Sequence, residues 1–164
     1  SIIVGRLGHG GLQCEAFTAG LIHDVGMLVL DRVLVGEKVS LEDAGRRVDV
    51  CLRERDVFGF DHCEVGSQLA QDWGFPEILV EPLAWHHDPG GPGSQQPLVQ
   101  AVTAGCLLAQ ELGADIEGDR PGQLNHWLDT IGLDRDLIQQ LRLDLPANLG
   151  EICDAATALV PVRN

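Results

Sequence analysis

A histidine and an aspartate stand side by side in apolar sequence, where their side chains could do chemistry. His23 and Asp24 lie in the stretch Ala19–Leu30, in which every other residue is apolar or glycine. A carboxylate buried without a partner is costly, so it needs a cation, a metal ion or several hydrogen-bond donors. The position of Asp24 therefore predicts a partner of one of these kinds.

Further histidines downstream could supply that partner through a metal ion. His62 stands alone, and His86 and His87 are adjacent. Imidazole nitrogens and a carboxylate oxygen together form a ligand set that suits zinc, manganese or iron. The alternative is structural: His23 and Asp24 form a hydrogen-bonded pair that joins two helices, with His62 and His86 as satisfied polar groups of the core.

The elements that must position the first pair are helices. Phe17 and Leu21 lie one turn apart and predict a helix over residues 13–21, with the histidine and aspartate at or just past its end. Gly26 then allows a bend before a second apolar run, Met27–Leu34. The pair is thus expected at a helix junction inside the core.

The later histidines are expected at the ends of two other helices. Asp61 is placed to cap a helix, with Glu64 three residues later, so His62 falls in its first turn. Pro76 begins the next helix, and residues 86–87 lie near the C-terminus of that helix. All the candidate ligands thus lie at helix ends, where they can be aimed at one point.

The remaining chain is also expected to be helical. Residues 97–112 form a long apolar pattern, and Gly105 in its middle predicts close contact with another helix. Trp73 and Trp85 are expected to anchor the core. Shorter helices are expected over residues 121–131, 134–143 and 149–159, and no alternating strand pattern is present. The predicted fold class is all-α.

The most basic segment of the chain follows Ser40, where a capping-box pattern begins a predicted helix. One face of this helix is apolar, and the opposite face carries Arg46, Arg47, Arg53, Glu54 and Arg55. That face is either a solvated surface with local ion pairs or a landing site for an acidic partner or a phosphate.

Composition narrows the classes of protein. With 164 residues, of which 45% are hydrophobic and 22% charged, the chain is expected to fold as one soluble domain. Its formal charge of −14 argues against a nucleic-acid surface, because phosphates would be repelled. No apolar run approaches the ~18 residues of a membrane span, and no signal peptide follows Ser1. We therefore expect a cytoplasmic protein with no membrane partner.

Two further features concern the chain ends and the cysteines. The absence of an initiating Met indicates a fragment of a longer chain. The cysteines are odd in number, widely spaced and without a Cys-x-x-Cys pair, which predicts reduced core thiols rather than a disulfide or zinc framework. They are Cys14, Cys51, Cys63, Cys106 and Cys153.

Taken together, these motifs resemble a known family. Similarity to the HDOD branch, the HD-related output domain of the HD metal-dependent phosphohydrolase superfamily, is carried by Ala16–Gly26, Phe60–Gly66 and Trp73–Pro76 with His86 and His87. The resemblance implies a single compact all-α bundle. It covers residues 1–113, the HD core, well, and residues 114–164, a helical extension, loosely.

The resemblance also implies a site and a role. In the HD superfamily such residues hold metal ions that activate water against a phosphate ester, which nominates as ligands His23, Asp24, His62, His86 and His87. The implied role is a regulatory output module of bacterial signal transduction, which acts through other signalling proteins or domains or senses a small phosphate-bearing ligand. The alternative is a metal-dependent phosphohydrolase of a nucleotide or cyclic dinucleotide, with Arg47 or Arg53 steering phosphate.

Three departures from the family pattern favour a non-catalytic module with a degenerate pocket. His9 lies in a glycine-rich turn and does not match the earlier histidine of the family. Cys106 stands where the catalytic branch has an aspartate, and a thiol poorly replaces a carboxylate that holds a hard ion. Met27 stands in place of the Lys of cyclic-dinucleotide phosphodiesterases, and the chain has no Tyr for their Gly-Tyr-Pro loop.

Overall fold

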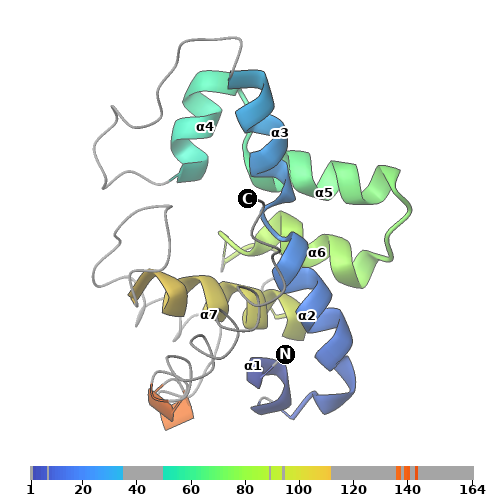
Figure 1. The fold of residues 1–164 in the computed structure, drawn as a ribbon, viewed down its shortest axis with the longest axis vertical. Helices are drawn as coiled ribbons and strands as arrows, with labels where there is room; N and C mark the ends of the chain where they lie inside the picture. Colours follow the sequence, from blue (N-terminus) through green and yellow to red (C-terminus); the bar gives the residue numbers. More distant parts are fainter. Residues whose placement is uncertain are drawn as a thin grey trace, which may run out of the picture. The chain divides into compact units, whose positions relative to one another are not determined.

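The structure, a computed structural model, describes residues 2–6, 8–34, 50–88, 90–93 and 95–111, and positions 136, 137, 139, 140 and 143. All regular structure over these residues is helical, which confirms the predicted all-α class (Figure 1). The elements are α1 (Ile2–Arg6), the 3-10 turn η1 (Gly10–Leu12), α2 (Gln13–Ile22), α3 (Val25–Leu34), α4 (Val50–Phe58), α5 (His62–Asp72), α6 (Glu77–Trp85) and α7 (Pro97–Glu111).

The chain divides into two compact units, Ser1–Gly132 and Leu133–Asn164, and these helices belong to the first. The helices predicted around residues 13–21, after Asp61, from Pro76 and over 97–112 are confirmed. Most of the helix predicted after Ser40 and those predicted over 121–131 and 149–159 lie outside the described residues. The predicted boundary at residue 113 falls inside the first unit, also outside the described residues.

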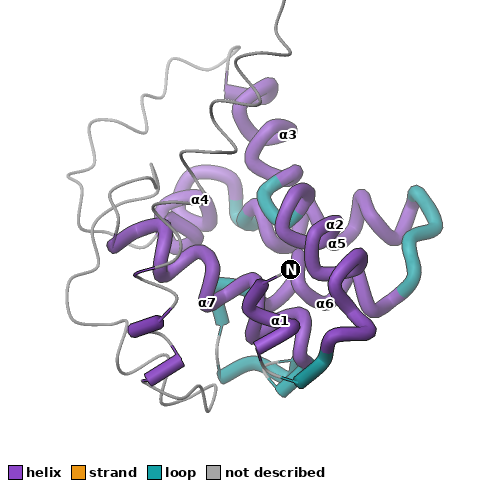
Figure 2. The backbone as a smooth tube through the Cα atoms, turned by 60° about the horizontal axis from the view of Figure 1, so that its bottom comes forward, coloured by secondary structure: helices purple, strands orange, loops and turns teal. Residues whose placement is uncertain are grey.

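Packing is organised around α5 and α7. Helix α5 packs against α3 and α6, and α7 packs against α1, α2 and α6, with short turns between several of them (Figure 2). Leu83, Leu98 and Leu108 are fully buried in these contacts. Each buried leucine of this kind contributes about 1.5–3 kcal/mol, and Leu83 thus anchors α6, the helix that ends at His86 and His87.

Gly26, rather than Gly105, marks a close helix contact. A Cβ atom on Gly26 would overlap the carbonyl oxygen of His62 and lie 2.8 Å from the backbone nitrogen of Gly66. Among the described residues, a Cβ atom on Gly105 would meet Ile3 at an ordinary 3.9 Å, so this part of the chain shows no close contact of the predicted kind at Gly105. The absence of a side chain at Gly26 lets the start of α3 lie against the first turn of α5.

The expected core role of Trp73 is wrong. Trp73 is 57% exposed because it is the C-cap residue of α5, where its side chain leaves the packed face of that helix. Trp85, at the end of α6, is half-buried. Its indole lies directly beneath Gly91, whose Cβ would come within 2.7 Å of it.

The buried face of α2 is formed by its small residues. Ala16 and Ala19 face the core, and this turns Phe17 and Leu21 outward. Cys14 is likewise exposed, so the prediction that it is a core thiol is wrong. The helix forms as predicted, but its small residues, not its large ones, make the interior contact.

Candidate metal site

The pair His23 and Asp24 forms the turn between α2 and α3. His23 Nδ1 lies 2.8 Å from the carbonyl oxygen of Gly20, which can only accept, and His23 Nε2 lies 2.9 Å from Asp24 Oδ2. Burial opposes protonation of His23, but hydrogen bonds with Asp24 and Cys106 outweigh it and raise the pKa of His23 to about 11. His23 is therefore a cation that donates from both nitrogens and holds Asp24 in place.

Asp24 is ionised by the same contacts. Burial would raise the pKa of Asp24, but the hydrogen bond from His23 and the positive charge of that ring hold it well below its usual range. Because Oδ2 is engaged by His23, Oδ1 is the oxygen left for another partner.

His62 is fixed by the loop between α4 and α5. Asp61 caps α5: its Oδ1 accepts from the backbone N–H of Glu64 at 2.9 Å, as predicted, and its Oδ2 contacts Arg55 Nη2 at 2.7 Å. Fully buried Glu54 then accepts from His62 twice through Oε2, from the backbone N–H at 2.9 Å and from Nδ1 at 2.6 Å. With the proton on Nδ1, His62 Nε2 carries a lone pair that can bind a metal ion.

His86 is held in the same way at the end of α6. Its Nδ1 donates to the carbonyl oxygens of Pro82 at 2.9 Å and Leu83 at 3.2 Å, and its own carbonyl accepts from buried Thr103 Oγ1 of α7 at 3.1 Å. Burial is the main cause that lowers the pKa of His86 to about 4, so the ring is neutral at pH 7. Its Nε2 then carries a lone pair and no proton.

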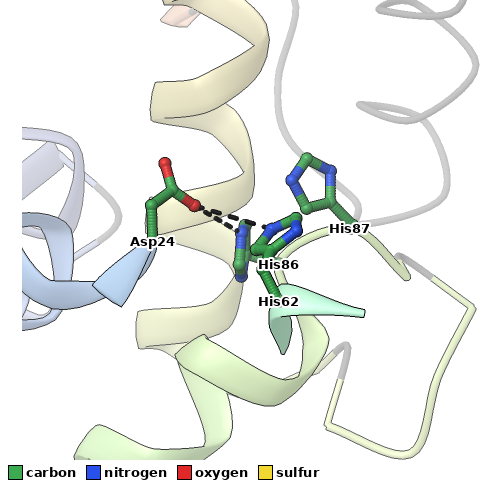
Figure 3. Close-up of side chains that lie close together, drawn as sticks. All are labelled: Asp24, His62, His86 and His87. Atoms are coloured by element: carbon green, nitrogen blue, oxygen red, sulfur yellow. Dashed lines mark ion pairs between the residues drawn. The ribbon is translucent and has the colours of Figure 1, made fainter. Parts of the chain in front are cut away.

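Four of the predicted ligands meet at one point. Asp24, His62, His86 and His87 each place a ligand atom within 4.8 Å of the others (Figure 3). Asp24 Oδ1 lies 3.2 Å from His86 Nε2 and 3.7 Å from His62 Nε2. The His87 ring lies 4.3 Å from the His86 ring and 5.1 Å from the His62 ring, between centroids. The carboxylate is 35% exposed, so the group opens to solvent on its side.

The group has the character of a cation site. Asp24 Oδ1 and His86 Nε2 are buried atoms, and within the described part of the chain no hydrogen bond satisfies either of them. Both are acceptors in the protonation states argued above, so they would repel each other across 3.2 Å without a positive charge between them. One carboxylate and three imidazoles are donors that zinc, manganese or iron accept, so the residues fit such an ion.

The other predicted site residues are placed differently. His23 lies beside this group, with its ring 5.0 Å from that of His86, but it is not one of the four. Arg46 and Arg47 lie outside the described residues. Arg53 is half-buried on α4 and is not part of the group either.

Glu54 and Thr103 were missed as site residues. The prediction that Glu54 lies on the solvated face of its helix is wrong, because the inward face of α4 carries Val50, Cys51 and Glu54. Its spacing, three residues after Cys51, is the signal that could have found it. Nothing local in the sequence marks Thr103, whose partner lies 17 residues away.

Comparison with known proteins identifies the family. The model of the HDOD domain matches residues 2–89, more than half of the chain. The chain therefore belongs to the HDOD domain family, as the motifs of the sequence implied.

Individual relatives are much longer proteins. The chain is 26% identical over 98 residues to an uncharacterized protein of Treponema pallidum (strain Nichols), covering 58% of this chain and 19% of that protein. It is 29% identical over 119 residues to a Ribonuclease Y of Thermus thermophilus, covering 73% of this chain and 18% of that protein.

A solved structure extends the match. It is that of a candidate signal transduction protein from Marinobacter aquaeolei VT8, with a TM-score of 0.72 and 25% identity, covering 87% of this chain and 32% of that one. The chain thus spans less than a third of the length of each of these proteins. None of the helices over the described residues has the length and apolarity of a membrane span.

Proposed function

We propose that this chain is a regulatory output module of bacterial signal transduction, in which Asp24, His62, His86 and His87 hold one divalent transition metal ion without turning over a phosphate ester. The ion is zinc, manganese or iron. The module acts in the cytoplasm on other signalling proteins or domains, or binds a small phosphate-bearing ligand. A formal charge of −14 disfavours nucleic acid as the partner.

One observation carries the metal in this proposal: the buried acceptors Asp24 Oδ1 and His86 Nε2 face each other at 3.2 Å. An ion between them would supply the missing positive charge. The four donors come from the α2–α3 turn, the start of α5 and the end of α6. A bound ion would therefore join three separate parts of the fold. Metal binding could in this way change how these parts are held together, and a partner protein could respond to that change.

Family membership and the departures from the catalytic pattern support the regulatory role. The Marinobacter protein is described as a candidate signal transduction protein. Cys106, which stands in place of the later aspartate of the catalytic branch, bonds to His23 and is not one of the four residues of the group. Met27 replaces the expected phosphate-holding Lys. Among the described residues, the pocket thus fits a cation site, and Met27 brings no positive charge that would hold a substrate phosphate.

The test combines metal content with a turnover assay. Wild type, His86→Ala and the control His9→Ala, in which an exposed histidine outside the group is removed, are incubated with Mn²⁺, Fe²⁺ or Zn²⁺, and bound metal is measured by mass spectrometry. With Mn²⁺ or Fe²⁺ we expect one ion per chain in wild type and His9→Ala and none in His86→Ala, and we expect no hydrolysis of cyclic dinucleotides by any of them. A wild type that binds no metal would leave His23 and Asp24 as a structural pair.

A metal-dependent phosphohydrolase is the second candidate. It is favoured by the similarity to Ribonuclease Y and by the solvent opening at Asp24. In that case the ion would activate water, and His87, the half-buried histidine of the group, would assist as ligand or proton carrier. Hydrolysis of a nucleotide or cyclic dinucleotide that disappears in His86→Ala would establish this candidate and refute the regulatory one.

A further inference from the structure

A second group of donor atoms adjoins the first. Cys51 of α4 and His62 and Cys63 of α5 each place a ligand atom within 4.8 Å of the others, and all three side chains are buried. Cys63 Sγ lies 3.6 Å from His62 Nε2 and 3.9 Å from His86 Nδ1. Cys63 thus borders the four-residue group, and the two groups of donor atoms have His62 in common.

His62 can serve only one of the two groups at a time. Its Nδ1 is bonded to Glu54, which leaves Nε2 as the ring nitrogen for an ion. That atom lies 3.7 Å from Asp24 Oδ1 and 3.6 Å from Cys63 Sγ. An ion bound at Nε2 can therefore complete its ligand set with oxygen and nitrogen or with sulfur, and the chemistry of the ion decides which.

The charge of the thiol group suits a soft divalent cation. Two thiolates and a neutral imidazole balance a charge of +2, whereas one carboxylate and three imidazoles leave a net positive charge. Sulfur ligands favour such a cation over hard ions such as Mg²⁺.

A cavity beside the thiols gives such an ion room and access. It measures about 180 Å³, and its lining includes Cys51, Cys63, Arg55, Asp61 and Trp85. Three protein ligands with one position left for water or another small ligand is a pattern that zinc sites adopt when they exchange ligands. The cavity can hold that fourth ligand.

We propose that Cys51, His62 and Cys63 form a second, thiol-based site for a thiophilic divalent cation of the zinc class. Binding replaces two thiol protons, which pass to solvent, by one divalent ion, and no electron is transferred. Because His62 offers a single nitrogen, filling this site empties the four-residue site, and the identity of the metal sets which helix ends are joined. The site shares His62 with the proposed function but does not require that function to be correct.

Cobalt(II) is the probe, added to reduced, metal-free protein. Thiolate ligands give cobalt an intense charge-transfer band in the near ultraviolet, which nitrogen and oxygen ligands do not. We expect the band in wild type, in Asp24→Asn and in the control Cys14→Ser, whose thiol is exposed. We expect its loss in Cys51→Ser and in Cys63→Ser.

The outcomes separate this site from the one under the proposed function. Cobalt that binds without the charge-transfer band would overturn the thiol site and leave the four-residue site standing, whereas a wild type that binds no cobalt would overturn both. A band that vanishes in Asp24→Asn would show one mixed site instead of two exclusive ones. If the serine variants fail to fold, X-ray absorption of zinc-loaded wild type decides: sulfur neighbours at about 2.3 Å support the site, and only nitrogen or oxygen at about 2.0–2.2 Å refutes it.

Discussion

Removal of Glu54 tests the geometry of the site through a residue that no ion would touch. Its Oε2 is the acceptor for both the backbone N–H and Nδ1 of His62, and all of these atoms are buried. In Glu54→Ala both donors lose their acceptor. Leaving a buried donor without an acceptor costs about 1–3 kcal/mol, so we expect a loss of at least this size in the free energy of unfolding. In Glu54→Gln an amide oxygen can still accept, and the loss should be about 1 kcal/mol.

The same substitution should weaken metal binding. Without Glu54, the His62 proton is no longer held on Nδ1 and can move to Nε2, where it occupies the lone pair that faces Asp24. Loss of a partner that orients a metal-bound histidine lowers metal affinity by about 10–100-fold. We expect Glu54→Ala to lie at the upper end of this range and Glu54→Gln at the lower end.

Two measurements check both expectations. Urea unfolding of the metal-free protein, followed by circular dichroism, gives the stability, and calorimetric titration with Zn²⁺ gives the affinity. Asp56→Asn, an exposed position on the same helix, is the matched control. If Glu54→Ala unfolds within about 0.5 kcal/mol of Asp56→Asn and binds zinc equally well, the contacts of Glu54 do not organise the site.

Two further predictions concern the backbone contact and pH. Gly26→Ala forces a Cβ against the His62 carbonyl, so urea unfolding should show a loss of about 1–3 kcal/mol or more in the free energy of unfolding. The control Gly20→Ala, whose Cβ would meet no described atom within 4 Å, should be neutral or slightly stabilising. Equal unfolding midpoints for the two variants would contradict the close contact at Gly26. Burial lowers the pKa of His86 from 6.5 to about 4, so the unfolded chain binds this proton first as pH falls. The free energy of unfolding of the metal-free protein should therefore fall by up to about 3 kcal/mol between about pH 6.5 and 4, before Asp24 titrates. In His86→Asn the dependence of this free energy on pH should be weaker. An unchanged pH dependence in that variant would refute the lowered pKa of His86.

The helical fold and the position of the histidines at helix ends could be predicted because their signals are local. Asp61 caps α5 with an atom three residues from its partner, and Pro76 precedes α6 as its N-cap. Glu54 could not be placed by residue type, since a lone Glu is almost always exposed. Its burial depends on His62, which reaches it only when α4 and α5 fold against each other. The helical spacing from Cys51 indicates that Glu54 faces inward, but no local signal identifies His62 as its partner.

Adjacency in sequence also concealed the different roles of His23 and Asp24. Both carry ligand atoms, but the direction of their hydrogen bonds separates them: His23 donates to the Gly20 carbonyl and to Asp24 Oδ2, and so has no lone pair to offer. By holding one carboxylate oxygen, it turns the other, Oδ1, toward His86 and His62. The pair therefore acts as a unit in which a protonated histidine aims a carboxylate at the cation site. The two residues lie next to each other in the turn between α2 and α3, where adjacent side chains can meet because they do not project from different faces of one helix.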